Sequence, residues 1–200
     1  MLPLFPLPNV VLFPGGLLPL HIFEPRYRAM TADALEGDRR IGMVLLQPGY
    51  EVDYEGRPPV YPIGCSGVIA HSVRLDDGRY HIVLRGLDRF RIVSEDHARA
   101  YRRAAIETLF DPALEDDDRR DMSDLRASLA AFLGDSYQPL SPMPDAEFVH
   151  TLAQSLDLEP LEKQALLESE NLCLRARSLV QLLEMKRLLA GMPAGPDVRH

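Results

Sequence analysis

The spacing of apolar residues changes once in this chain, near residues 111–112, and that change constrains the fold more than any other feature. Before it, short apolar runs are broken by proline and glycine, and apolar residues alternate with the two-residue period of a strand. After it, apolar residues recur every three or four positions, as on one face of a helix. The sequence therefore predicts an α+β protein, with a β-rich subdomain at 1–110 and a helical subdomain at 111–200.

The clearest strands form a predicted β-hairpin. Apolar residues alternate through 69–75 and again through 80–84, and Asp77-Gly78 between them suits a tight turn. Gly86 then predicts a bulge or a sharp bend. Farther on, Phe90 and Ile92 alternate with Arg89 and Arg91, which predicts a half-buried strand with a basic outer face.

The rest of the first half contains shorter segments. Alternating apolar residues predict a strand at 18–22, and Pro25 is suited to the first turn of a helix that runs to Gly37. The continuous apolar run 41–46 is typical of a strand covered on both faces. The segment 50–62, rich in proline, charge and tyrosine, is expected to be a surface loop.

Four helices are expected in the second half, because each of four segments carries an apolar stripe at helical spacing. Such stripes cannot each stay exposed, so a compact helical bundle packed beside the sheet is expected. The segments are 122–132, 149–156, 160–166 and 171–190.

Composition excludes several classes of protein. No apolar run is long enough to cross a bilayer and no secretory signal is recognisable, so a cytoplasmic protein without membrane association is expected. The net charge is −8, and residues 111–200 carry 9 basic and 17 acidic groups, so nucleic acid is an unfavourable partner. Two cysteines, Cys65 and Cys173, are too few for a disulfide scaffold or a zinc site.

No set of residues predicts catalysis. The chain contains no G-x-S-x-G, H-E-x-x-H, Walker-type phosphate loop or C-x-x-C motif. His71 and His81 can face one another across the predicted hairpin, but no third ligand stands at a fixed spacing from them. We therefore expect no catalytic residues, no metal and no cofactor.

The best candidate for a binding surface is the corner where the strand at 18–22 gives way to the helix. Phe23, Glu24, Pro25, Arg26 and Tyr27 place two aromatic rings and a pair of opposite charges around a fixed bend. Such a corner is able to bind an extended apolar peptide. The alternative is structural: the aromatic ring closes the end of the sheet, and the acidic residue favours the helix amino terminus.

Second-rank candidates are aromatic residues of loops. They are Phe13, in the sequence F-P-G-G, and Tyr50 and Tyr54, in the predicted surface loop. A basic stripe of Arg85, Arg89 and Arg91 is a further possibility, although solvated arginines paired with nearby acids are the simpler interpretation.

Several short motifs in a fixed order make the chain resemble the amino-terminal, substrate-binding domain of the Lon protease family. In the first half they are L-P-L-F-P-L at 2–7, V-V-L-F-P-G at 10–15, L-P-L-H-I-F-E-P-R-Y at 18–27, G-M-V-L at 42–45, I-G-C at 63–65, D-G-R-Y at 77–80, and Gly86 with R-F at 89–90. In the second half they are E-K-Q-A-L-L-E at 162–168 and L-R-A-R at 174–177.

The resemblance implies a six-stranded, partly open β-barrel of the PUA-like type, followed by a small helical bundle. It also implies a role in the capture of damaged or unfolded proteins. Because 200 residues leave no room for the ATPase and peptidase parts of the protease, we expect a stand-alone bacterial member of the family.

Three functional hypotheses follow. The first is a non-catalytic module that binds unfolded or extended polypeptide, as an adaptor or regulator of proteolysis with a protease or another protein as partner. The second is an RNA-binding module of the PUA-like type that depends on the three arginines. The third is a small-molecule-binding protein with a pocket between sheet and bundle.

Overall fold

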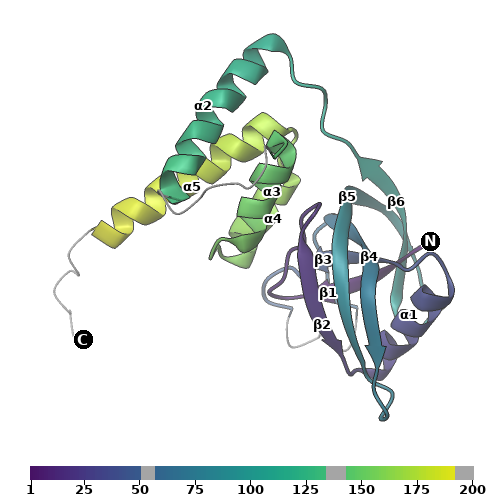
Figure 1. Cartoon of the computed structure of the whole chain (residues 1–200). Coiled ribbons are helices and arrows are strands. Elements are labelled where there is room, and N and C mark those ends of the chain that lie inside the picture. Colours follow the sequence, from purple (N-terminus) through teal and green to yellow (C-terminus); the bar gives the residue numbers. More distant parts are fainter. Residues whose placement is uncertain (51–56, 134–142, 192–200) are drawn as a thin grey trace.

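The structure is a computed structural model that describes residues 1–50, 57–133 and 143–191. Six strands occupy the first half of the chain, and a helical bundle occupies the second (Figure 1). The strands are β1 (Leu2–Leu7), β2 (Leu17–Ile22), β3 (Arg40–Leu45), β4 (Ile63–Arg74), β5 (Tyr80–Asp96) and β6 (Arg102–Leu109). The helices are α1 (Pro25–Glu36), α2 (Asp116–Leu133), α3 (Asp145–Ser155), α4 (Pro160–Glu168) and α5 (Leu172–Gly191). The predicted α+β class is confirmed.

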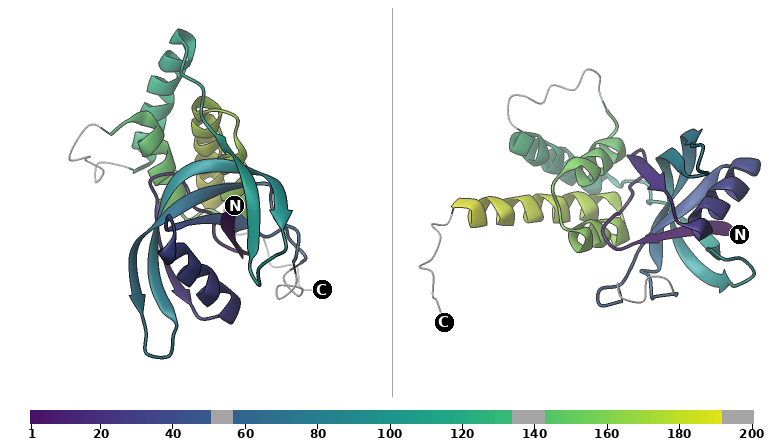
Figure 2. Two further views of the ribbon diagram at one scale, coloured as in Figure 1. Left: turned by 90° about the vertical axis from the view of Figure 1, so that its right-hand side faces the viewer. Right: turned by 90° about the horizontal axis from the view of Figure 1, so that it is seen from below.

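The six strands form one curled sheet in the order β2-β5-β4-β3-β1-β6. Strand β6 pairs with β1 and also with the second half of β5, so that β1, β3, β4, β5 and β6 form a ring. Strand β2 lies outside that ring and, among the residues that the structure describes, pairs only with the first half of β5. The sheet is therefore strongly curved and partly closed, but it is not a regular barrel (Figure 2).

Local sequence explains the main turns. The β4–β5 hairpin closes where the Leu75 amide donates to the Arg79 carbonyl at 2.8 Å, and Gly78 adopts a φ of +79° that glycine accepts without strain. Helix α1 begins at Pro25, whose missing N–H is not needed in a first turn. Helix α4 begins with a capping box, in which the Glu162 carboxylate accepts a hydrogen bond from the Glu159 amide at 2.7 Å.

The helical bundle packs on one side of the sheet, and α1 lies on the other (Figure 2). The main hydrophobic cluster is continuous from the strands and α1 into α2–α5. A smaller cluster contains Leu4, Val44 and Phe90 and lies among β1, β3, β5 and β6. The main core extends across residues 110 and 111. The predicted boundary between two subdomains at this point therefore stays a prediction.

Polar contacts also join the two halves. The Phe13 amide donates to the Gln154 side chain at 2.9 Å, and the Gln164 side chain donates to the Ile63 carbonyl at 2.9 Å. Within β5, Gly86 approaches the backbone of residues 13–16 so closely that a Cβ there would lie 2.0 Å from the Phe13 carbonyl oxygen. The loop before β2 is thereby fixed between the sheet and α3.

Arg89 corrects one prediction from the sequence. It was expected on an exposed basic face, but its side chain is only 5% exposed and contacts Asp111 at 2.6 Å. The same guanidinium donates to the carbonyls of Leu167 and Ser169, at and just beyond the end of α4. The bundle covers the outer face of β5 at this point. The alternation correctly predicted that Arg89 lies on that face, but not that the face is buried there.

Candidate functional site

The corner between β2 and α1 contains one aromatic residue that is exposed to solvent and one that is buried in the core. Phe23 is 59% exposed, whereas Tyr27 is 3% exposed and its ring centroid lies 4.4 Å from that of Phe5. The Arg26 guanidinium bonds to the Glu24 carboxylate at 3.0 Å and lies over the Tyr27 ring at 4.6 Å. Phe23 is therefore the ring at this corner that a ligand can reach, whereas the Tyr27 ring packs in the core against Phe5.

A small apolar hollow opens beside this corner. Its volume is about 260 Å³, and its walls come from β1, β2 and the first turn of α1. We call it the β1–β2 hollow. The lining residues are Phe5, Leu7, Leu20, His21, Ile22, Phe23, Glu24 and Tyr27.

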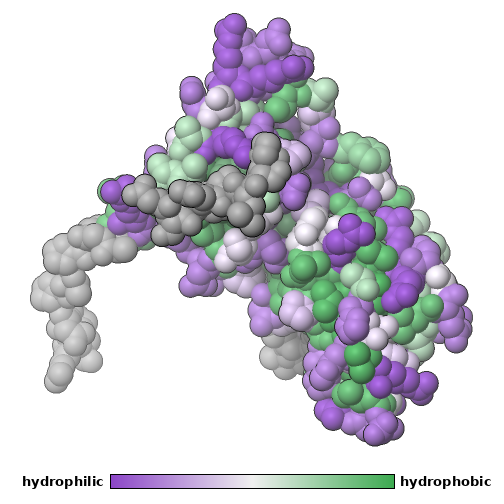
Figure 3. All heavy atoms as spheres, in the orientation of Figure 1, coloured by the Kyte–Doolittle hydropathy of each residue, from purple (hydrophilic) through white to green (hydrophobic). Residues whose placement is uncertain are grey.

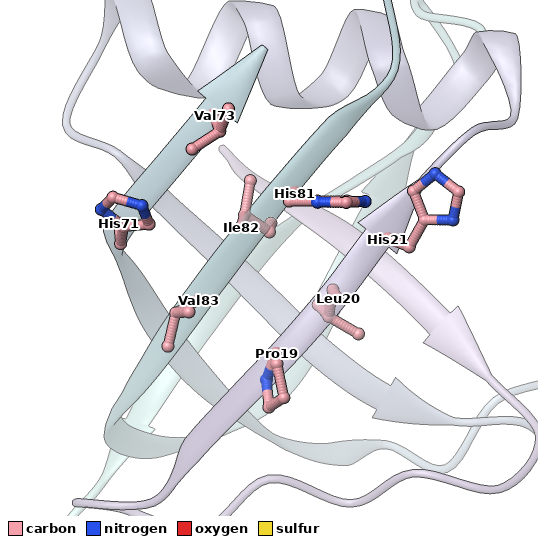
Figure 4. Close-up of a pocket in the computed structure, with 8 residues that line it drawn as sticks. All are labelled: Pro19, Leu20, His21, His71, Val73, His81, Ile82 and Val83. Carbon is pink, nitrogen blue, oxygen red and sulfur yellow. The ribbon is translucent and has the colours of Figure 1, made fainter. Parts of the chain in front are cut away.

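A second, shallower hollow of about 490 Å³ lies over β2, β5 and β4, and we call it the β2–β4 hollow (Figure 4). Its lining residues are Pro19, Leu20, His21, His71, Val73, His81, Ile82 and Val83. Leu20 and His21 also line the β1–β2 hollow. The two hollows therefore both border β2, which lies between them, and three imidazoles border the larger hollow.

The histidine pairing differs from the sequence prediction. The hairpin register places Val73 opposite His81 and Val83 opposite His71, so the predicted pair of His71 and His81 is wrong. His81 instead faces His21 on β2, with ring centroids 4.9 Å apart and the rings edge to face. Across the described part of the chain, no group of three or more His, Cys, Asp or Glu residues is arranged to bind a metal ion.

The second-rank aromatic candidates do not join this region. Phe13 is completely buried, with its ring 6.1 Å from that of His150 on α3, which corrects the expectation that it faces a ligand. Tyr50 is exposed but lines neither hollow. Tyr54 lies outside the described residues.

The predicted basic stripe on β5 does not form. Arg89 is buried, and Arg91 pairs with Glu107 at 3.2 Å. Arg85 is exposed, next to the start of β2. With one of its three arginines inside the protein, the stripe no longer supports the RNA-binding hypothesis.

Sequence reasoning located Phe23 but missed most of the region around it. Phe5 and Leu7 belong to β1, which does not pair with β2, and they line the hollow because the curled sheet brings the two strands close together. His21 and His81 become neighbours through the β2–β5 register, which no local motif encodes. The available signal was the alternation through 18–22, which places Pro19 and His21 on one face of the strand.

Some of the exposed large apolar side chains lie at this location, and others lie elsewhere, such as Phe110 after β6 and Leu188 on α5. Exposed large apolar side chains include Leu17 at the start of β2, Phe23 just after it and Val73 on β4. Figure 3 shows apolar surface gathered over the sheet half, whereas the far tip of α2 is hydrophilic. The acidic residues Asp116, Asp117 and Asp118 form the first turn of that helix.

Comparisons with known proteins agree with the fold. Lon protease 2 of Myxococcus xanthus is 28% identical over 197 residues, which are 94% of this chain and 24% of that protein. Lon protease of Roseiflexus castenholzii is 29% identical over 203 residues, with the same coverage of each chain. The chain thus spans about a quarter of the length of these relatives.

Two solved structures share the fold. The N-terminal domain of Mycobacterium avium complex Lon protease has a TM-score of 0.71 at 19% identity, covering 92% of this chain and 97% of that one. A Lon N-terminal domain protein from Xanthomonas campestris has a TM-score of 0.58 at 24% identity, covering 96% and 98%. No helix among the described residues combines the length and apolarity needed to span a bilayer.

The family model for the ATP-dependent protease La (LON) substrate-binding domain matches residues 1–185, and the chain therefore belongs to that family.

Proposed function

We propose that this protein binds extended, apolar segments of unfolded polypeptides along β2, with Phe23 as the aromatic anchor, and that it does not cleave them. The observation that carries the proposal is an accessible ring at the rim of an apolar hollow. Aromatic side chains in such positions provide a large contact area at a small loss of side-chain entropy. Membership of a substrate-binding domain family supports the same class of ligand.

The dimensions favour weak, sequence-tolerant binding. A hollow of about 260 Å³ accommodates one or two aliphatic side chains, and each buried Leu or Phe contributes roughly 1.5–3 kcal/mol. After the entropy lost on association is subtracted, dissociation constants on the order of micromolar or weaker are expected. Such affinity suits a protein that samples many unfolded chains.

The proposal extends to a role in proteolysis. The relatives matched over most of this chain are Lon proteases. We therefore propose that the protein recognises chains destined for degradation, as an adaptor or regulator that presents them to a protease.

Fluorescence anisotropy with reduced, carboxymethylated α-lactalbumin, a permanently unfolded protein, tests the binding. Phe23→Ser is expected to weaken binding at least about fivefold without lowering the melting temperature, because the ring is mostly in solvent. Val93→Ser is the matched control, since Val93 is 65% exposed on β5 and lines neither hollow. Equal affinity of the wild type and both variants would reject the site, and no binding by the wild type would reject the function.

A further inference from the structure

Strand β2 has one edge without a strand partner. The sheet closes through the pairing of β5 with β6, and β2 bonds only to β5. Among the described residues, no strand lies along its other edge. Unpaired main-chain groups along a strand edge form a template for a further strand.

The register shows which residues of β2 turn their backbone to that edge. The Gly86 amide donates to the Gly16 carbonyl at 2.8 Å, just before Leu17 pairs with Arg85. In an antiparallel ladder, bonded and non-bonded pairs alternate, so the next bonded pairs are those of Leu18 and Leu20.

The backbone groups of Leu17, Pro19 and His21 consequently face the open edge. Pro19 has no N–H to donate at that edge. Prolines within strands are typically found at such unpaired edges, where no ladder hydrogen bond is lost. The edge therefore presents three carbonyls but only two amide donors.

The hollows beside β2 match the side chains of an added strand. Leu20 and His21 border both hollows, so β2 separates them. Successive side chains of a strand point to opposite faces of a sheet. A strand laid along β2 would direct one set of side chains toward the β1–β2 hollow and the other toward the outer face.

We propose that the bound polypeptide adds to β2 as an extra strand of the sheet, which is a recognition mode driven by main-chain hydrogen bonds. This inference rests on the proposed function and specifies the conformation of its ligand. The bound segment must be extended and must carry apolar side chains at alternate positions. A folded protein rarely exposes such a segment with its backbone unpaired, so unfolded chains are preferred.

Charge selects among such segments. Arg85 is exposed opposite Leu17 and forms no ion pair with any residue that the structure describes. His21, His71 and His81 border the same face. One end of the bound segment lies beside Leu17 and therefore close to Arg85. A carboxylate at that end is favoured, and a lysine there is disfavoured.

The decisive probe is a fluorescein-labelled octapeptide of alternating leucine and serine that ends in aspartate. One version carries N-methyl groups on its leucines, and the other carries them on its serines. Only one set of amides can face β2, whichever direction the strand takes. One methylated version is therefore expected to bind at least about tenfold more weakly than the other. The dissociation constant of the stronger binder should stay close to that of the unmodified peptide.

A protein variant tests the same edge from the other side. Pro19→Ala adds an amide donor to the open edge and is expected to tighten binding about threefold. Pro62→Ala, a change of an exposed proline outside both hollows, is the control and should leave affinity unchanged.

Equal weakening by both N-methylated peptides, with the unmodified peptide still bound, would overturn strand addition while the proposed function stands. Failure of the protein to bind both the octapeptide and carboxymethylated α-lactalbumin would overturn both.

Discussion

Arg89 on β5 and Asp111, just beyond β6, form a 2.6 Å ion pair whose side chains are 5% and 22% exposed. Arg175 on α5 bonds to both oxygens of the same carboxylate, at 2.9 and 3.1 Å. The two guanidiniums also donate to carbonyls at the end of α4, those of Leu166, Leu167 and Ser169. One carboxylate and two arginines thus attach α5 and the end of α4 to the sheet.

Arg89→Met is expected to destabilise the protein by roughly 1.5–3 kcal/mol, because it removes charged hydrogen bonds to the Leu167 and Ser169 carbonyls and to Asp111, which keeps Arg175 as a partner. Urea denaturation measures the change. Arg91→Met is the control: Arg91 pairs with Glu107 at the surface, where such pairs contribute about 0–1 kcal/mol. Equal losses in the two variants would show that Arg89 does not hold sheet and bundle together.

Stability is expected to fall as the pH drops below neutrality. Burial, with the nearby positive charge of Arg175, lowers the pKa of His150 to about 4, whereas an unfolded histidine titrates near 6.5. Between these values the unfolded chain binds the proton first, so stability is full above about pH 6.5 and declines toward about pH 4. The loss from this residue is up to about 3 kcal/mol.

His150→Gln is the variant that isolates this effect, because it removes the titrating group. Denaturation midpoints measured from pH 7 to pH 4 should decline less steeply in the variant than in the wild type. The pKa of Asp111 is also lowered, since hydrogen bonds and charge from Arg175 and Arg89 outweigh the effect of burial, so its contribution is lost only at still lower pH. Parallel profiles for wild type and variant would contradict the assignment to His150.

The fold was largely predictable because its signals are local. The β4–β5 hairpin follows from alternation around Asp77-Gly78, and α1 follows from Pro25 and an apolar stripe. The four helices of the bundle lie close to their predicted segments. In each case the residues that determine the element lie within it.

The site was less predictable because its parts come together only in three dimensions. Phe5 reaches Tyr27 from β1, and His81 meets His21 through a register between distant strands. Arg89 looked like a solvated charge because alternation cannot show that α4, about 80 positions later, covers that face. Sequence motifs identified the family, but the surroundings of each side chain required the structure.

Gly86→Ala is expected to destabilise the protein by about 3 kcal/mol, since its Cβ would lie 2.0 Å from the Phe13 carbonyl oxygen, and backbone rather than a flexible side chain must move. Gly37→Ala is the comparison, because its Cβ would meet nothing nearer than 3.5 Å and the change should stay within about 1 kcal/mol. Thermal denaturation distinguishes the two. A Gly86→Ala protein as stable as wild type would disprove the close approach.

Cys65 is expected to be unreactive toward Ellman's reagent in the native protein. It is fully buried, and burial raises the pKa of its thiol well above the ordinary value, so almost no thiolate is present at pH 8. Reaction should begin only at urea concentrations that unfold the chain. Rapid labelling of Cys65 in native buffer, identified by peptide mapping, would contradict the packing of β4 against β3.

The most direct test of the central claim is the amide NMR spectrum of the protein during titration with the unmodified leucine-serine octapeptide. We predict that the largest shifts fall on Leu17, His21 and Phe23, with smaller ones at Phe5 and Leu7, while amides of α2 and α5 stay unchanged. Shifts concentrated on the helical bundle, with β2 and Phe23 unaffected, would contradict the account.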